Sequence, residues 1–158
     1  MRIFSTIAAA SFAMATGTSA LADRLHLICG GAGTATGSTE RSVSHADAGG
    51  NSATDTVRIP YSTPYTDQVD VDIDGETGKI RVPRNIVSGI HGGTDGVFEM
   101  RKIKFSDREI TATVSFNPFE GAKVRIDRMT GHISINASDG SFAGECTKFD
   151  PATAERRF

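Results

Sequence analysis

The sequence predicts an all-β protein, an antiparallel meander of about eight to ten strands closed as a barrel or a barrel-like sandwich. Apolar and polar residues alternate with period two along most of the chain, which is typical of strands with one buried face. The segments between these stretches are short and rich in turn-forming residues. Short hairpin connections make neighbouring strands antiparallel.

The alternation defines the expected strands in chain order: 25–29, 69–74, 79–82, 110–116, 124–127, 133–136 and 142–146. Turns are expected at 75–78, 106–108, 129–131 and 137–140, where Gly, Asp, Ser and Thr gather. No amphipathic helix of useful length is predicted, and only residues 84–88 have the composition of a single helical turn.

Residues 1–22 predict a secretory signal peptide that is cleaved and is not part of the fold. Arg2 precedes an apolar run from Ile3 to Ala15, and Ala20-Leu21-Ala22 fits the A-x-A cleavage rule. No later apolar run is long enough to span a membrane. We therefore expect a single all-β domain at 23–158, periplasmic or secreted and not membrane-spanning.

The two cysteines, Cys29 and Cys146, lie in the first and the last expected strands. In an oxidising compartment an even pair predicts a disulfide. Such a bond makes the two ends of the meander adjacent, as closure of an up-and-down barrel also requires. The pair favours a barrel whose ends are tied by the Cys29–Cys146 bond.

The stretch from Gly30 to Thr56 breaks the alternating pattern. It is rich in Gly, Ser and Thr, and Val43 is its only sizeable apolar residue. Two alternatives remain for it, a mobile loop or a pair of polar edge strands.

The stretch DVDIDGETGKIR, from Asp70 to Arg81, begins like a calcium loop. Asp70, Asp72 and Asp74 match the first three ligand positions of an EF-hand and Gly75 matches its turn glycine, but the twelfth position, which needs a chelating Glu, is Arg81. In an extended strand the three aspartates repeat at about 6.8 Å, too far apart to enclose one ion. We predict a solvated strand face here, and no metal site elsewhere, since the four histidines are scattered without ligand spacing.

Residues 88–98 form a glycine-rich connection, SGIHGGTDGVF, without the lysine of a phosphate-binding P-loop. As a loop at a barrel mouth it is a possible binding loop, formed by His91, Gly92, Gly93 and Asp95.

No catalytic residues or cofactor are predicted, because Ser44, His45 and Asp47 gather only within the polar stretch 30–56. A pI near 6.1 without a basic stripe or any tryptophan argues against nucleic acid.

The last third of the chain, KVRIDRMTGHISINASDGSFAGECTKFDP, resembles a family of short, exported, mostly uncharacterised proteins of Gram-negative, alphaproteobacterial-type bacteria. Their shared pattern reads R-I-D-R-x-T-G-x-I, followed by glycine, an aromatic residue and G-x-C. The match covers about residues 90–158, with a weaker L-x-C-x-G-x-G start at 27–33. The resemblance implies export and fold but no activity. Within the motif, Arg125, Asp127 and Arg128 are a possible surface charge patch.

These observations predict a periplasmic, non-enzymatic β protein that binds a small apolar ligand or an envelope protein. The alternative is a structural or inhibitory module acting through its surface loops around a filled core, and a hydrolytic enzyme is the weakest hypothesis. The state of the barrel interior separates the first two, because an open apolar interior favours a ligand and a filled one favours the module.

Overall fold

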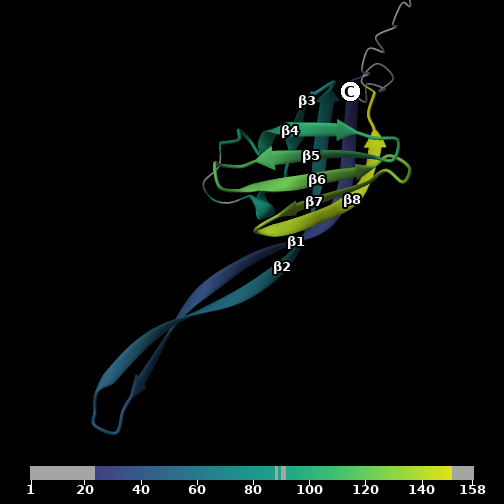
Figure 1. Cartoon of the computed structure of the whole chain (residues 1–158). Helices are drawn as coiled ribbons and strands as arrows, with labels where there is room; N and C mark the ends of the chain where they lie inside the picture. Colours follow the sequence, from purple (N-terminus) through teal and green to yellow (C-terminus); the bar gives the residue numbers. More distant parts are fainter. Residues whose placement is uncertain (1–23, 88, 90–91, 151–158) are drawn as a thin grey trace, which may run out of the picture.

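The computed structural model describes residues 24–87, 89 and 92–150 (Figure 1). The predicted signal peptide and His91 lie outside the described residues. Eight antiparallel strands pair in sequence order, and the last pairs with the first, which confirms the predicted closed barrel. The strands are β1 (Leu25–Ala46), β2 (Ser52–Asp74), β3 (Thr77–Arg81), β4 (Val97–Phe105), β5 (Glu109–Ser115), β6 (Gly121–Asp127), β7 (His132–Ala137) and β8 (Gly140–Lys148). A short 3₁₀ turn, η1 (Arg84–Ile86), lies where the single helical turn was expected.

The ends of the meander are joined covalently. Cys29 on β1 is directly opposite Cys146 on β8, and the two form a disulfide. The predicted bond is therefore confirmed. Because β1 and β8 pair along 27–35 and 140–148, the barrel has no open seam there.

The barrel interior is filled by side chains. The buried apolar residues, all 8% exposed or less, form one cluster: Leu27, Cys29, Val69, Val71, Ile73, Ile80, Val82, Ile86, Phe98, Met100, Ile110, Ala112, Val114, Phe116, Ala122, Val124, Ile126, Ile133, Ile135 and Phe142. They come from every strand and from η1, since inward and outward residues alternate along each strand. Small barrels of this strand number are commonly packed cores in this way.

The stretch that begins like a calcium loop is a β-hairpin, as predicted. Asp70, Asp72 and Asp74 end β2, and Gly75, at φ 58°, makes the turn into β3. Asp70 is opposite Arg81 and Asp72 is opposite Lys79 in the register, so opposite charges face each other across the strands. Among the described residues no three His, Cys, Asp or Glu side chains gather as metal ligands.

The strand β4 was not predicted, and a β-bulge explains why. Its pairing with β5 shifts register between Arg101 and Lys104, where Lys102 has φ 53°. The buried positions Phe98 and Met100 are even-numbered, whereas the partly buried Ile103, within the bulge, is odd-numbered. One extra residue in a bulge changes which face the following side chains occupy, so the period-two pattern is interrupted.

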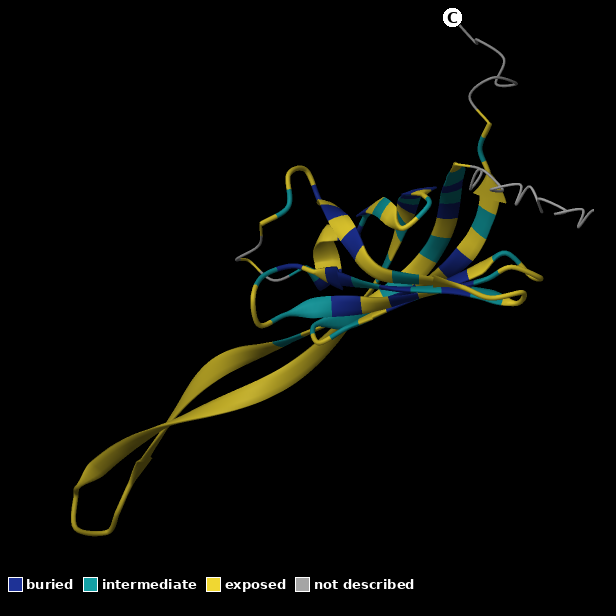
Figure 2. Ribbon diagram, turned by 45° about the horizontal axis from the view of Figure 1, so that its top comes forward, coloured by how far each residue is buried: buried dark blue, intermediate teal, exposed yellow. Residues whose placement is uncertain are grey.

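The stretch 30–56 is a β-hairpin and not a loop. Residues 30–46 belong to β1 and 52–56 to β2, and the two strands pair continuously from Leu25 with Ile73 to Ala46 with Ser52. Beyond the barrel this hairpin continues alone into solvent as a long twisted ribbon (Figures 1 and 2). We call residues 37–61 the arm. The described part of the chain holds no helix with the length and apolar character needed to cross a bilayer.

Candidate functional site

The arm is fixed to the barrel at its base. Thr36 donates its backbone N–H to the carbonyl of Asp139, at 2.8 Å, and the Tyr65 hydroxyl donates to the carbonyl of Ser141, at 3.0 Å. Burial raises the pKa of Tyr65 to about 12, with a smaller contribution from the charge of Asp67. The base of the arm therefore continues the structure of the barrel wall.

Two faces of different chemistry follow from the register of the arm. Directly opposite residues of an antiparallel pair share a face, and successive residues alternate between faces. Odd-numbered residues of β1 and β2, such as Cys29 and Val71, face the barrel interior, so the odd-numbered residues of the arm continue that face into solvent. We call this the apolar face: Gly37, Thr39, Arg41, Val43, His45, Ala53, Asp55, Val57, Ile59 and Tyr61. The other face is mainly polar: Ser38, Glu40, Ser42, Ser44, Ala46, Ser52, Thr54, Thr56, Arg58 and Pro60.

The large side chains of the apolar face are uncovered. Val43, Val57, Ile59 and Tyr61 are 44%, 47%, 42% and 53% exposed. Figure 2 shows exposure along the whole arm, in contrast to the buried stripes of the barrel. An ordered series of exposed apolar residues on one face of a ribbon is typical of a surface that binds another molecule.

Glycines of β1 accommodate the aromatic rings of β2. Gly37 is opposite Tyr61, and a Cβ on Gly37 would lie 2.6 Å from the Cζ and Oη atoms of the Tyr61 ring. Gly33 and Tyr65 have the same relationship at the base, again at 2.6 Å. Each ring therefore lies across a glycine of the neighbouring strand, an arrangement that compensates for the missing glycine side chain.

Charges on the arm differ between the faces. On the polar face Arg58 donates to Glu40 at 3.0 Å. On the apolar face His45 lies 3.4 Å from Asp55 near the tip. Arg41, on the same face opposite Val57, makes no ion pair with the described residues.

The tip of the arm is a closed polar turn. The Oδ1 atom of Asp47 accepts hydrogen bonds from the backbone N–H groups of Gly49 and Asn51, each at 2.9 Å. These bonds hold the pKa of the Asp47 carboxyl below its usual value, and the bond from the backbone of Asn51 contributes most. Gly50 has φ 80°, a conformation that favours glycine.

The residues considered for a catalytic triad are separated by this geometry. Ser44 is on the polar face, 3.2 Å from the Thr54 hydroxyl, whereas His45 is on the apolar face beside Asp55. Asp47 is held in the turn. The arm therefore places these three side chains in different environments.

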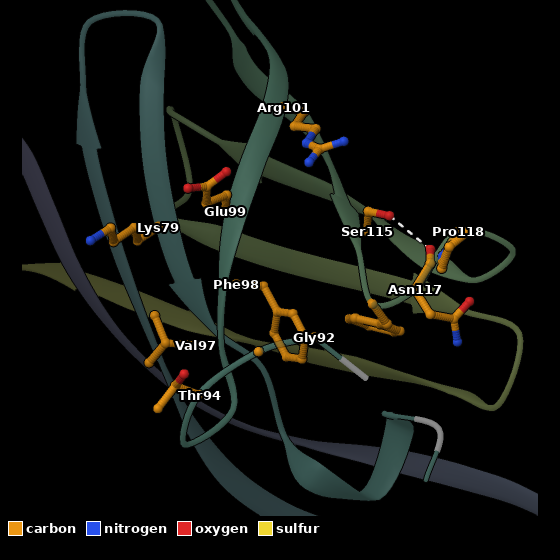
Figure 3. Close-up of a pocket in the computed structure, with 12 residues that line it drawn as sticks. Lys79, Gly92, Thr94, Val97, Phe98, Glu99, Arg101, Ser115, Asn117 and Pro118 are labelled. Atoms are coloured by element: carbon orange, nitrogen blue, oxygen red, sulfur yellow. Dashed lines mark hydrogen bonds between the residues drawn. The ribbon is translucent and has the colours of Figure 1, made fainter. Parts of the chain in front are cut away.

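Part of the predicted binding loop lines a hollow of about 600 Å³ on the barrel (Figure 3). Gly92 and Gly93 form one wall, together with the ring of Phe98 from β4. Asp95 does not line it, because Asp95, at φ 53°, and Gly96, at φ 77°, make the turn in which Val97 donates to the carbonyl of Thr94.

Polar groups also line that hollow. The Ser115 hydroxyl donates to the carbonyl of Asn117 at 2.9 Å. Lys79 and Glu99 project at the rim from β3 and β4 (Figure 3). The hollow is therefore a mixed polar and apolar surface depression.

The predicted charge patch is divided among three local contacts. Arg125 donates to Glu109 across β5 and β6. Asp127 accepts from the N–H groups of Met129 and Thr130, at 2.8 and 3.0 Å. Arg128 donates to the carbonyl of Ser106 at 2.7 Å. The structure thus gives each of the three residues a structural contact at the strand ends.

A second hollow, of about 650 Å³, lies at one end of the barrel. Its lining is mainly apolar, with Asp127, Arg128 and Lys148 among its polar members. The apolar members are Leu25, Leu27, Phe105, Ile110 and Ile126.

Comparisons of the chain with protein-family models, curated proteins and solved structures find no match. The resemblance of the last third to exported proteins of Gram-negative bacteria stays a prediction.

The apolar face of the arm was missed in the sequence, although one signal for it was present. In VRIPYSTPY, from Val57 to Tyr65, the apolar or aromatic residues Val57, Ile59, Tyr61 and Tyr65 are all odd-numbered. Pro60 and Pro64 conceal the strand, because proline is excluded from central strands. Both prolines are tolerated here because only β1 pairs with β2 over this stretch.

Proposed function

We propose that the protein is an exported, non-enzymatic interaction module that binds a protein of the cell envelope through the apolar face of its arm. The observation that supports this best is the exposed series Val43, Val57, Ile59 and Tyr61 on one face of a ribbon. The filled barrel interior favours a module that works through its surface. The barrel acts as a rigid base and the arm as the binding element.

The proposed compartment follows from the disulfide and the predicted signal peptide. Bonds such as Cys29–Cys146 persist in oxidising compartments, which include the periplasm and the extracellular space. The motif from Arg125 to Arg128 resembles that of exported proteins, and this resemblance supports the same compartment.

A protein partner explains the arm better than a lipid surface. Arg41 and Asp55 belong to the apolar face. A charged side chain on a lipid-facing strand costs about 2–4 kcal/mol at the bilayer midplane for Arg, and less for Asp. A protein surface can supply partners for both charges.

Photo-crosslinking from two adjacent positions on opposite faces tests this proposal in the full chain. A photoreactive amino acid at Val57 lies on the apolar face, and the same group at Thr56 lies on the polar face. We expect protein adducts in the cell envelope from position 57 and few from position 56. Equal labelling from both positions, or none from either, would overturn the proposal.

A small apolar ligand at the barrel end is a second candidate, favoured by the hollow lined by Leu25, Leu27 and Ile126. Phe105, 51% exposed, lies at this hollow and is not part of the buried core cluster. If a fluorescent fatty acid binds, Phe105→Asp should weaken binding at least tenfold, whereas Phe119→Asp, at an exposed site outside the hollow, should not. An equal effect of the two substitutions excludes this site.

A further inference from the structure

Given the protein-binding role proposed above, on which this step rests, we infer that the envelope protein adds an extended strand to the open edge of β1 in the arm. Strand addition obtains its affinity from main-chain hydrogen bonds and its specificity from alternate side chains. Beyond the barrel the arm has only its two strands (Figure 1). A two-stranded hairpin is at best marginally stable in water, and a third strand on an apolar face supplies what it lacks.

The direction of the backbone groups of β1 follows from the base of the arm. Thr36 donates its N–H away from β2, to the carbonyl of Asp139 in the turn before β8. Successive residues of an antiparallel strand point these groups to opposite sides, and the register of β1 with β2 is continuous through the arm. The even-numbered residues of β1 therefore direct their N–H and C=O groups outward: Ser38, Glu40, Ser42 and Ser44.

The tip of the arm gives the same direction independently. Asp47 donates its N–H across the hairpin to the carbonyl of Asn51, at 2.9 Å. The odd-numbered residues of β1 are thus bonded to β2, and the even-numbered residues remain for the outer edge.

This outer edge of β1 is open. Strand β8 pairs with β1 only as far as Ala35, which is opposite Gly140. Within the described part of the chain, residues 37–46 pair with β2 alone. From Ser38 to Ser44 the edge is about 20 Å long at 3.4 Å per residue, enough for a segment of about seven residues. Proline and lysine, which commonly protect edge strands, do not occur between 37 and 46.

The outer edge of β2 is protected instead. Opposite residues of an antiparallel pair exchange both hydrogen bonds or neither. Because the odd-numbered residues of β1 are bonded to odd-numbered residues of β2, the even-numbered residues of β2 point outward. Pro60 in the arm and Pro64 at its base occupy two of these positions. Each removes an N–H group from the outer edge without breaking a bond inside the hairpin, so we place the added strand on β1.

The side chains beside the open edge define the chemistry of the added segment. Its residues opposite the odd-numbered residues of β1 share the apolar face, in the pairs whose side chains lie closest. Arg41 makes no ion pair with the described residues, so an Asp or Glu of the partner opposite it forms a cross-strand charge pair. Opposite Val43, which is 44% exposed, an apolar residue of the partner is favoured.

The polar face requires no further charge from the partner. Glu40 already accepts from Arg58 at 3.0 Å, and the other outward residues between 38 and 44 are serines. The added segment therefore alternates polar residues with apolar ones, and carries one acidic residue on its apolar side.

Photo-crosslinking from two directly opposite residues of the polar face tests the position of the added strand. Ser42 lies on the open edge, and Thr56, its partner on β2, lies on the protected edge. With the full chain in cells, a photoreactive amino acid at position 42 should capture the same envelope protein as at Val57, as identified by mass spectrometry. Position 56 should capture about tenfold less, because a strand of the ribbon separates it from the partner.

Proline substitution at the same two positions tests the role of the backbone. Ser42→Pro removes an outward N–H group from β1, and Thr56→Pro removes the matching group from β2. With the photoreactive group at Val57, Ser42→Pro should lower the yield of adduct about tenfold and Thr56→Pro should leave it nearly unchanged. Ser42→Ala keeps the N–H group and should also have little effect. Equal effects of the two prolines would overturn strand addition.

The charge of Arg41 tests the predicted acidic residue. Arg41→Glu should lower the yield of adduct from Val57 about tenfold, because like charges would then be opposite each other, whereas Arg41→Lys should retain most of it. Position 41 is exposed on the arm, as are positions 42 and 56, so the barrel should keep its melting temperature in every variant. An unchanged yield in Arg41→Glu would overturn the acidic partner residue.

The outcomes separate this inference from the proposed function. If position 57 captures an envelope protein and position 42 captures none, the partner packs on the apolar face, so strand addition fails and the protein-binding role stands. If position 57 captures no protein, both fail. If the adduct from position 42 contains only this chain, a second copy supplies the strand, and the assignment to an envelope protein is overturned.

Discussion

Cys29 and Cys146 are directly opposite each other on β1 and β8, with their Cα atoms 3.9 Å apart and a separation of 117 residues in the sequence. The Cys29 side chain is completely buried in the barrel core. The bond joins the first and last strands at the point from which β1 continues toward the arm. Closure of the barrel therefore combines a covalent bond with the backbone ladder of β1 and β8.

Loss of this bond should destabilise the protein. In the chain-entropy account, a disulfide that closes so long a loop restricts the unfolded chain, and we expect Cys146→Ala or reduction to lower the free energy of unfolding by about 2–5 kcal/mol. Urea denaturation with and without reductant measures the change. Two free thiols in the unfolded exported protein would show that the bond is absent, and a loss below about 0.5 kcal/mol would show that the ladder suffices.

Two neighbouring glycines of β1 should respond differently to the same substitution. A Cβ on Gly31 would lie 2.1 Å from the carbonyl oxygen of Ala143 on β8, whereas a Cβ on Gly30 would meet nothing within 4 Å. We expect Gly31→Ala to lower the free energy of unfolding by about 1–3 kcal/mol through this overlap. Gly30→Ala, the matched control, should change it by less than about 0.5 kcal/mol. Equal effects of the two substitutions would contradict the close approach of β1 and β8.

The barrel could be predicted from the sequence because most of its strands have one buried face and short turns. Asp70 to Arg81 shows how far this works. Alternation identified both strands of the hairpin and the turn between them. β4 was not predicted, because its bulge at Arg101 to Lys104 moves the apolar residues from even-numbered to odd-numbered positions.

The arm was not predicted from the sequence for a different physical reason. Its β1 strand from Gly37 to Ala46 buries no side chain, so this strand has no apolar period to detect. Glycines such as Gly37, which usually indicate loops, are present because a Tyr ring from the other strand lies across them. That pairing depends on the register, which is a property of the folded hairpin and not of either segment alone.

The turn held by Asp127 should make stability depend on pH. Hydrogen bonds from the backbone N–H groups of Thr130 and Met129 hold the pKa of the Asp127 carboxyl below its ordinary value of 3.8. A carboxyl whose pKa is lower in the folded state than in the unfolded state stabilises the protein at pH values above the unfolded pKa. That stabilisation is lost as the pH falls through the folded pKa. Asp127→Asn keeps the shape but does not titrate. The wild type should therefore be more stable than the variant at neutral pH, and the two should converge in acid.

Urea denaturation of both proteins across the acid range measures this difference. Other carboxyls with lowered pKa values, such as Asp47 and Asp72, are present in both proteins and cancel in the comparison. A difference in stability that does not change with pH would show that the charge of Asp127 is unimportant for the turn.

The hydroxyl of Tyr65 should ionise only in strong alkali. Burial, and to a lesser extent the charge of Asp67, raises the pKa of Tyr65 from 10.0 to about 12. A group whose pKa is raised on folding contributes stability that is complete below the unfolded value of 10.0 and is lost as the pH rises through the folded value.

The chain contains two tyrosines, so their phenolate absorbance can be assigned by substitution. In an alkaline titration, Tyr65→Phe should remove a step near pH 12, and Tyr61→Phe should leave that step in place. Because Tyr65→Phe also removes the hydrogen bond to Ser141, it should lower the free energy of unfolding by about 0.5–1.5 kcal/mol at neutral pH. Circular dichroism at each pH establishes that the barrel is still folded, and a step that disappears in Tyr61→Phe instead would mean that Tyr65 is not held at the base of the arm.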